Sequence, residues 1–258
     1  MLLLFIACLV KPLPSGRGSS PMEKKIKPYI IKREGYERVL YRNESYWKEI
    51  DKKRYDILLR RSGIPHFYWS IDFKDYKGDL SKANLKKAIQ YSEECFTDKF
   101  EYVNLYLYSK ENSSQKTAIS CNVGKEAIRQ NKKVQFILAG SLIDMLLKQS
   151  GFTHYPEIAN ELKKLKESDL LIIDDVFDTK KSVHWQNSNI TTSEWDRFLR
   201  ELLVSRTKVV MTSNMTIDEI QKNYGKSMKE LINRNFIDLE FKDSITKERK
   251  RKFDNLFD

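Results

Sequence analysis

Five short apolar runs alternate with longer amphipathic stretches over the second part of the chain. The apolar runs are YVNLYLY (102–108), VQFIL (134–138), LLIID (170–174), VVMTS (209–213) and FIDLEF (236–241). Between the first four runs, apolar residues recur at helical spacing over 117–130, 141–149, 157–166 and 193–204. Each connection is long enough to cross between parallel strands. This order predicts an α/β protein with a mostly parallel five-stranded sheet and helices on both faces, over residues 101–242.

A basic segment rich in aromatic residues precedes this region. Within it, residues 45–61 place apolar side chains such as Trp47 and Leu58 near one helical face, and Gly63 stops the helix. We therefore expect residues 22–62 to form a small, basic, helical N-terminal region.

A linker and a further helix connect this region to the predicted sheet. Residues 63–100 contain a helical pattern over 80–96, with Asp79 or Ser81 as its N-cap. Beyond the last apolar run, residues 243–258 form a basic tail, and such a charge run is typical of a solvated segment.

The first residues of the chain are apolar but too few to cross a membrane. The run MLLLFIACLV covers residues 1–10, and a helix of that length spans about half of a bilayer core. A signal peptide carries its positive charge before the apolar run, whereas Lys11 follows it. Linker-like residues come next, and Met22 is a plausible start. We expect residues 1–21 to be a disordered leader or non-native extension and the protein to have no membrane partner.

The composition favours an acidic partner and a reducing compartment. The 258 residues carry a formal net charge of +11, which is typical of proteins that bind nucleic acid; a lysine-rich surface without such a partner is the alternative. The three cysteines, Cys8, Cys95 and Cys121, are not spaced as metal ligands or as a disulfide framework. Reduced cysteines of this kind indicate a cytoplasmic protein.

The stretch YLYSKENSSQKTAI, residues 106–119, has the layout of a phosphate-binding loop. An apolar run ends in a polar turn, and Lys116 and Thr117 then open a predicted helix. Such a loop needs inward-facing backbone N–H groups, a lysine for the phosphates of ATP and a hydroxyl for Mg²⁺. Four residues would supply the backbone groups: Asn112, Ser113, Ser114 and Gln115.

This loop contains no glycine. The standard pattern has glycine at the positions that Lys110 and Gln115 occupy here. A non-glycine residue at positive φ costs on the order of 1–2 kcal/mol, and Asn112 tolerates that geometry best. Taken alone, the stretch is therefore either a nucleotide site without its glycines or an ordinary turn.

Polar side chains also follow two other apolar runs. Asp174 and Asp175 end the third run, where one carboxylate could bind Mg²⁺ and the other orient a water molecule. Asn214 follows the fourth run, where an amide could hold that water or a phosphate oxygen. Each alone is also explained as a turn, with Thr216 capping the next helix. In an open α/β sheet, however, all three sets meet beyond the carboxyl ends of the strands, which predicts one nucleotide site.

These stretches resemble the AAA+ module of DnaC/DnaI-type replicative helicase loaders and the related IstB-like ATPases. The resemblance covers roughly residues 59–241 and rests on YLYSKENSSQKT, DLLIIDDVF and TKVVMTSNM. It implies a P-loop AAA+ fold that uses ATP and Mg²⁺, with a Walker A motif, a Walker B motif and a sensor asparagine. The corresponding residues are Lys116 and Thr117, Asp174 and Asp175, and Asn214. The glycine-free loop, and aspartate where many AAA+ proteins have glutamate, depart from the pattern.

The arginine finger of the family has no direct counterpart. Where the resembling proteins carry a Ser-Arg pair after a Tyr-Gly element, this chain has Lys229 and Glu230. Arg234 is the nearest candidate to reach the γ-phosphate of a neighbouring subunit, and Arg206 is the second candidate. An ordinary surface arginine is an equally good interpretation.

The resemblance implies an ATP-dependent helicase loader in DNA replication, and one form of this hypothesis is a phage-encoded loader. Its partners would be single-stranded DNA, a ring-shaped DnaB-type replicative helicase, and further copies of the chain bound through the ATPase domain. The basic N-terminal region would dock onto the helicase, or grip single-stranded DNA by stacking. The glycine-free loop favours weak ATP hydrolysis. An IstB-like transposition ATPase and a degenerate, non-hydrolysing P-loop module that binds protein or DNA are the alternatives.

Overall fold

The computed structural model describes residues 29–33, 36–40, 44–111, 114–150, 155–177 and 189–244. The predicted leader, nearly all of the basic tail, and Asn112 and Ser113 of the phosphate loop lie outside the described residues.

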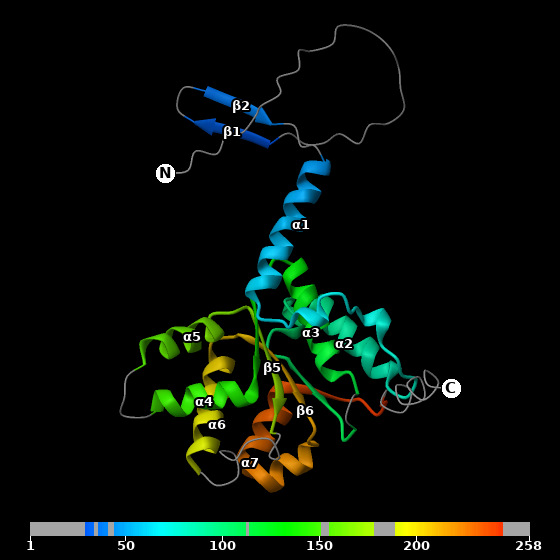
Figure 1. The fold of residues 1–258 in the computed structure, drawn as a ribbon, viewed down its shortest axis with the longest axis vertical. Coiled ribbons are helices and arrows are strands. Elements are labelled where there is room, and N and C mark those ends of the chain that lie inside the picture. Colours follow the sequence, from blue (N-terminus) through cyan, green and yellow to red (C-terminus); the bar gives the residue numbers. More distant parts are fainter. Residues whose placement is uncertain are drawn as a thin grey trace, which may run out of the picture. The chain divides into compact units, whose positions relative to one another are not determined.

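The chain divides into two compact units, Met1–Ile50 and Asp51–Asp258. In the first unit, β1 (Tyr29–Arg33) pairs antiparallel with β2 (Tyr36–Leu40), and α1 (Glu44–Arg61) follows and runs into the second unit (Figure 1).

The helical expectation for the N-terminal region holds only from Glu44 onward. Strands β1 and β2 form an antiparallel pair instead, because YIIKR and YERVL are rich in β-branched and aromatic residues that favour strands. The two strands are separated by only two residues, one of them Gly35, which is the commonest length of a hairpin connection. Basic residues in both strands also suit a helix, so composition alone does not separate the two structures.

The second unit contains the predicted five-stranded sheet. Its strands are β3 (Asn104–Tyr108), β4 (Val134–Leu138), β5 (Leu170–Val176), β6 (Lys208–Ser213) and β7 (Phe236–Glu240). The order is β4-β5-β6-β3-β7, and every neighbouring pair is parallel. The prediction of a mostly parallel α/β sheet is therefore confirmed.

Helices connect the strands as the periodicity predicts. They are α2 (Lys82–Glu94), α3 (Lys116–Arg129), α4 (Ala139–Ser150), α5 (Pro156–Lys166), α6 (Asn189–Val204) and α7 (Ile217–Asn235). Thr216 caps α7 as expected, since its hydroxyl accepts a hydrogen bond from the Glu219 N–H. At Gly225 the backbone leaves helical geometry (φ 87°), which kinks α7. Among the described helices, none has the length and apolar character needed to span a membrane.

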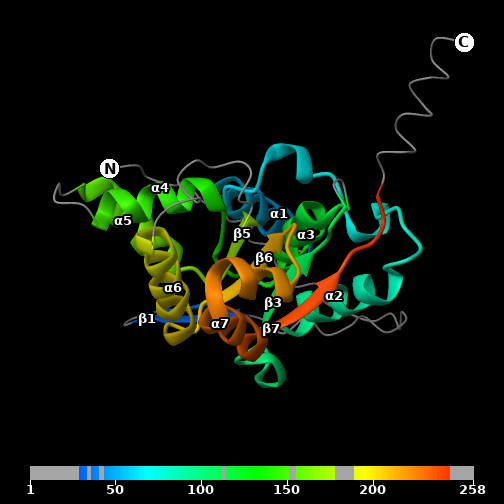
Figure 2. The same cartoon turned by 90° about the horizontal axis from the view of Figure 1, so that it is seen from below.

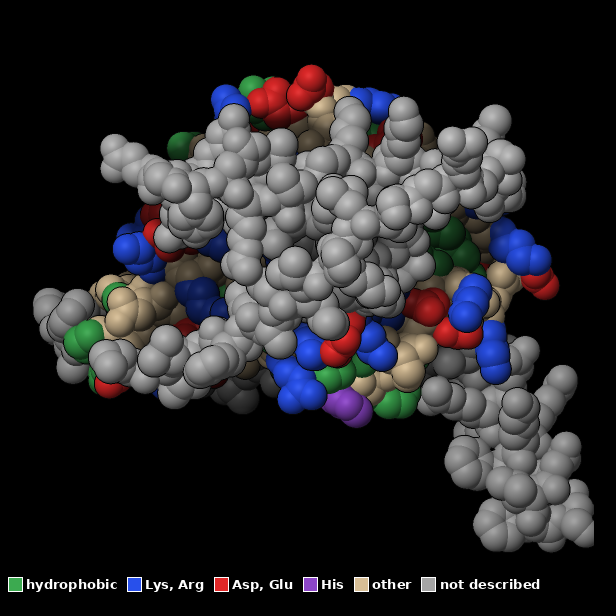
Figure 3. Space-filling model, turned by 90° about the horizontal axis from the view of Figure 1, so that it is seen from above, with side chains coloured by type: hydrophobic (Ala, Val, Ile, Leu, Met, Phe, Trp, Pro, Cys, Tyr) green, Lys and Arg blue, Asp and Glu red, His purple; other side chains and the backbone are tan. Residues whose placement is uncertain are grey.

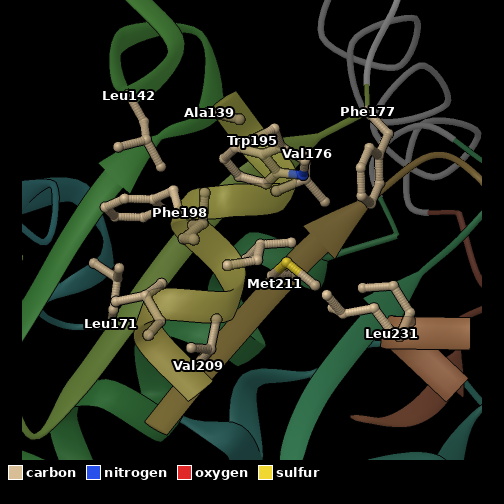
Figure 4. Close-up of a cluster of buried hydrophobic side chains, with 14 of the residues drawn as sticks. Ala139, Leu142, Leu171, Val176, Phe177, Trp195, Phe198, Val209, Met211 and Leu231 are labelled. Atoms are coloured by element: carbon tan, nitrogen blue, oxygen red, sulfur yellow. The ribbon is translucent and has the colours of Figure 1, made fainter. Parts of the chain in front are cut away.

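The sheet lies between two helical layers, each with its own apolar core (Figure 2). Successive residues of β5 alternate between them: Leu171 and Ile173 belong to the core with α4, α6 and α7, and Leu170 and Ile172 to the core with α2 and α3. Figure 4 shows the first core, where Trp195 and other α6 side chains pack over β5 and β6. Burial on both faces explains why the strands read as continuous apolar runs.

The strand order determines where the polar candidates lie. Strands β5, β6 and β3 are neighbours in the sheet, and all three run in the same direction. The residues that follow them are therefore brought to one edge, at the carboxyl ends of the strands.

Candidate nucleotide-binding site

Lys116 occupies the centre of this edge. It is the first residue of α3, and its side chain is almost fully buried. Its Nζ donates hydrogen bonds to Ser114 Oγ at 2.9 Å and to Asn214 Oδ1 at 3.1 Å. The ammonium group thus joins the loop after β3 to the end of β6, at a helix N-terminus that favours anions.

A hydroxyl and a carboxylate meet beside Lys116. The Thr117 Oγ1 donates a hydrogen bond to Asp174 Oδ1 at 2.9 Å, and the Thr212 hydroxyl donates to the same oxygen at 2.6 Å. Burial of Asp174 raises the pKa of its carboxyl, and the two hydroxyl bonds and the Lys116 charge only partly offset this effect.

The pair formed by Thr117 and Asp174 fits Mg²⁺. Magnesium binds oxygen ligands, and in nucleotide sites it is held by one or two protein groups together with phosphate oxygens and water. A neutral hydroxyl and a carboxylate in contact are such a set. Within the described part of the chain, no cluster of three or more His, Cys, Asp or Glu side chains could hold a metal ion by itself. Water or phosphate oxygens would have to supply the remaining ligands.

The backbone at Asp175 is displaced from regular strand geometry. The pairing of β5 with β6 shifts register between Ile173 and Val176, and Asp175 has a positive φ of 59°. Its N–H donates to the Thr212 hydroxyl at 3.0 Å instead of continuing the strand ladder. Such a bulge re-aims a side chain, and left-handed non-glycine residues of this kind cluster at functional sites.

Gln115 takes the conformation that a glycine usually supplies. Its φ is 66°, in the left-handed region, immediately before Lys116. The side-chain amide makes two hydrogen bonds to the backbone of Lys77: Nε2 donates to the carbonyl at 2.9 Å, and Oε1 accepts from the N–H at 3.3 Å. A left-handed residue with a Cβ costs roughly 1–2 kcal/mol, and two hydrogen bonds of about 1 kcal/mol each are sufficient to offset that cost.

Two residues that the sequence reasoning missed also border the site. The Tyr68 phenol lies beside Thr117 and Asp174: burial raises its pKa, the Asp174 charge raises it further, and the Thr117 hydroxyl opposes the shift. The buried Lys125 on α3 anchors the segment that carries this tyrosine, because its Nζ donates to the carbonyls of Tyr68, at 3.1 Å, and Ile71. In the sequence, Tyr68 is one of many aromatic residues and Lys125 one of many helical lysines, so neither contact could be predicted from it.

The two arginine-finger candidates lie at the amino ends of the strands, opposite the candidate site. Arg234 comes two residues before β7, whose first residue pairs with Asn104 at the start of β3; its side chain is exposed and lies 3.9 Å from Glu230. Arg206 precedes β6 and pairs with Glu101 at 2.9 Å. Neither contacts the site within its own chain, so a finger role stays a prediction that requires a neighbouring subunit.

The structure therefore brings together Ser114, Gln115, Lys116, Thr117, Asp174, Asp175 and Asn214. Their convergence is observed, whereas their chemical roles stay predictions.

Comparison with known proteins gives matches in structure and none in sequence. No protein-family model matches the chain, and no curated protein matches it significantly. The crystal structure of the DnaC helicase loader matches 69% of this chain and 100% of its own, with a TM-score of 0.56 and 14% identity. The crystal structure of DnaI matches 68% of this chain and 93% of its own (TM-score 0.56, 16% identity).

A replication initiator has the same fold. The structure of DnaA bound to AMPPCP and single-stranded DNA matches 74% of this chain and 57% of its own, with a TM-score of 0.55 and 15% identity. At such low identities these matches show the fold alone: the chain has a DnaC-type AAA+ fold.

Proposed function

We propose that the chain binds ATP with Mg²⁺ at the edge formed by β5, β6 and β3. The observation that carries the proposal is the hydrogen-bonded contact of Lys116 with Asn214 and of Thr117 with Asp174. Lys116 and the N-terminus of α3 would bind the β- and γ-phosphates. Thr117 and Asp174 would hold Mg²⁺, which supplies positive charge to the phosphate oxygens. A DnaA structure of the same fold contains AMPPCP, an ATP analogue, which supports this assignment.

The same site has groups for slow hydrolysis. Asp175, at the bulge of β5, would orient the attacking water, with Asn214 holding that water or the γ-phosphate. Arg234 and Arg206 pair with Glu230 and Glu101 in their own chain, away from this site, so the transition-state charge would be stabilised by one of these arginines from a neighbouring subunit. The proposed activity is therefore a weak ATPase that depends on self-association.

We infer a helicase-loader role in DNA replication from the fold. Structures with the same fold include the DnaC helicase loader, DnaI and the replication initiator DnaA. The partners in this proposal are a ring-shaped DnaB-type helicase and further copies of the chain. An IstB-like transposition ATPase has the same site requirements, and pull-down with a ring helicase against a transposase separates the two roles.

A basic groove supports single-stranded DNA as a further partner. It has a volume of about 870 Å³ and lies between the end of α1, β4 and α5. Five basic side chains line it: Arg60, Arg61, Lys133, Lys163 and Lys164. The last two are paired with glutamates at 3.6–3.7 Å, whereas the first three form no ion pair with any described residue. The half-buried Phe136 also lines the groove, and basic side chains together with an aromatic ring suit a single strand.

One face of the molecule is mixed in charge where its side chains are visible. Figure 3 shows Lys and Arg side chains in blue interspersed with Asp and Glu in red on the visible part of the face seen from above. We therefore assign DNA to the groove by its lining residues rather than by a uniformly basic face.

The deciding experiment is titration of a fluorescent ATP analogue with Mg²⁺ into the intact protein and into Lys116→Ala. We expect micromolar binding by the intact protein and a loss of at least tenfold in the variant. Lys87→Ala is the matched control, because this lysine of α2 is exposed and lies outside the phosphate loop and the hydrogen-bonded site. Failure of the intact protein to bind, even with single-stranded DNA present, would favour the non-hydrolysing binding module.

A further inference from the structure

The carboxylate of Asp243 organises the segment before α2. It accepts hydrogen bonds from the Tyr76 hydroxyl at 2.8 Å, the Ser81 N–H at 2.9 Å and the Leu80 N–H at 3.1 Å. Asp243 follows β7, so these contacts join parts of the chain that are more than 160 residues apart. They also satisfy backbone donors at the start of α2, where the Ser81 side chain makes no capping bond.

The segment is closely fitted to this carboxylate. A Cβ added at Gly78 would lie 2.4 Å from Asp243 Cγ, so the backbone can approach this closely only where the residue has no side chain. The Ser81 hydroxyl accepts from the Lys242 N–H at 2.8 Å, and the Tyr76 ring contacts Phe241. Residues 76–81 are thus shaped by the chain that follows β7.

The same segment holds the phosphate loop at its other side. Lys77, next to Tyr76, presents both its N–H and its carbonyl to the Gln115 amide. Gln115 has a positive φ, which is unfavourable for a residue with a side chain. Its carbonyl accepts a hydrogen bond from the Ile119 N–H in the first turn of α3. The position of Lys116 therefore depends on a conformation that Lys77 helps to maintain.

We propose that Gln115 and Asp243 are positioning residues for the phosphate loop, connected through residues 76–81. Gln115 takes the place of the missing loop glycine by binding Lys77, and Asp243 holds Lys77 in the place where Gln115 can reach it. Neither role needs contact with the nucleotide. The inference rests on the proposed ATP site for its functional consequence, but the connection itself is a property of the protein without nucleotide.

A double-mutant cycle tests this connection. Affinity for the fluorescent ATP analogue with Mg²⁺ is measured for the intact protein, Asp243→Asn, Gln115→Gly and the double variant. We expect D243N to weaken binding about tenfold when Gln115 is present and less than twofold in the Q115G background, because glycine adopts the left-handed conformation without support. A merely structural role of Asp243 would give the same loss in both backgrounds, and that result would overturn the proposal.

Hydrogen exchange gives a second readout that does not require ATP. The Ile119 amide, in the first turn of α3, should exchange several-fold faster in D243N than in the intact protein. In the Q115G background, adding D243N should leave its exchange rate unchanged. Unchanged exchange in D243N would also overturn the proposal. If the intact protein shows this coupling but binds no ATP, the proposed function fails while the connection stands.

Two further variants guard against loss of the fold. Asp238→Asn is the matched control, since Asp238 is an exposed carboxylate on β7 with no hydrogen bond or ion pair to a described residue, and it should change neither readout. If D243N does not fold, Tyr76→Phe removes only one of the three bonds to Asp243. We expect it to weaken ATP binding two- to threefold in the Gln115 protein and not in Q115G; equal effects in both would count against the proposal.

Discussion

Lys116 Nζ donates a hydrogen bond to Asn214 Oδ1 at 3.1 Å and thereby joins the first turn of α3 to the end of β6. The two residues are 98 positions apart in the sequence, and the parallel pairing of β3 with β6 brings them together. A neutral amide leaves the positive charge of the lysine available to phosphate, whereas a carboxylate at the same place would neutralise it.

We therefore predict that Asn214→Asp weakens ATP binding by at least tenfold, because the new carboxylate pairs with Lys116 and repels the phosphates. Asn214→Ala should instead lower the rate of hydrolysis at least tenfold, with a smaller change in affinity. Titration with the fluorescent ATP analogue and a phosphate-release assay measure the two effects. Equal affinity of the Asp and Ala variants would contradict an electrostatic role for the amide.

The buried Asp174 leads to a prediction about stability. Burial raises the pKa of its carboxyl in the folded protein, so the folded state binds this proton more readily than the unfolded state does. The contribution of Asp174 to the free energy of unfolding therefore falls as the pH rises from the unfolded pKa through the raised folded pKa. Above that range, Asp174 makes the folded state less stable than a carboxyl with an unshifted pKa would.

Asp174→Asn should accordingly stabilise the nucleotide-free protein at pH 7.5 by about 1 kcal/mol while removing the Mg²⁺ dependence of ATP binding. Urea unfolding without nucleotide or metal measures the change. The advantage of the variant should shrink as the pH is lowered, because Asp174 then becomes protonated and resembles asparagine. A variant less stable than the original protein at pH 7.5 would show that the hydroxyl bonds from Thr117 and Thr212 outweigh the desolvation of the charge.

The sheet could be predicted from the sequence because its information is local. Runs such as LLIID are apolar on both faces, which is the pattern of a strand covered by helices on both sides, and the five strands lie within a few residues of their predicted limits. The placement of Asp174 and Asn214 at one edge follows from the strand order of a parallel sheet, so it needed no contact information.

The supports of the site could not be predicted because they depend on contacts between distant segments. The Gln115 amide bonds to Lys77, 38 residues away, and Lys125 bonds to the carbonyl of Tyr68, 57 residues away. In the sequence, Gln115 is only a missing glycine and Lys125 only a helical lysine. The paired strands β1 and β2 did have a local signal, their β-branched and aromatic residues, but their basic residues also suit a helix.

The basic groove yields a prediction about DNA. Arg60→Glu combined with Arg61→Glu should weaken binding of a single-stranded oligothymidylate at least tenfold, since both arginines line the groove and form no ion pair with a described residue. Lys86→Glu with Lys87→Glu on α2 changes the net charge equally and lies outside the groove, so it should change affinity less than twofold. Fluorescence anisotropy at several salt concentrations measures both pairs.

The salt dependence identifies the kind of contact that is lost. For single strands, each phosphate contact contributes about 0.7 to the slope of log K against log salt, so removing two contacts should reduce the slope by about 1.4. An equal loss of DNA binding in both double variants would mean that only the net charge matters, and the groove would not be the DNA site. An unchanged affinity in the arginine variant, together with lost binding to a ring helicase, would assign the groove to an acidic protein surface instead.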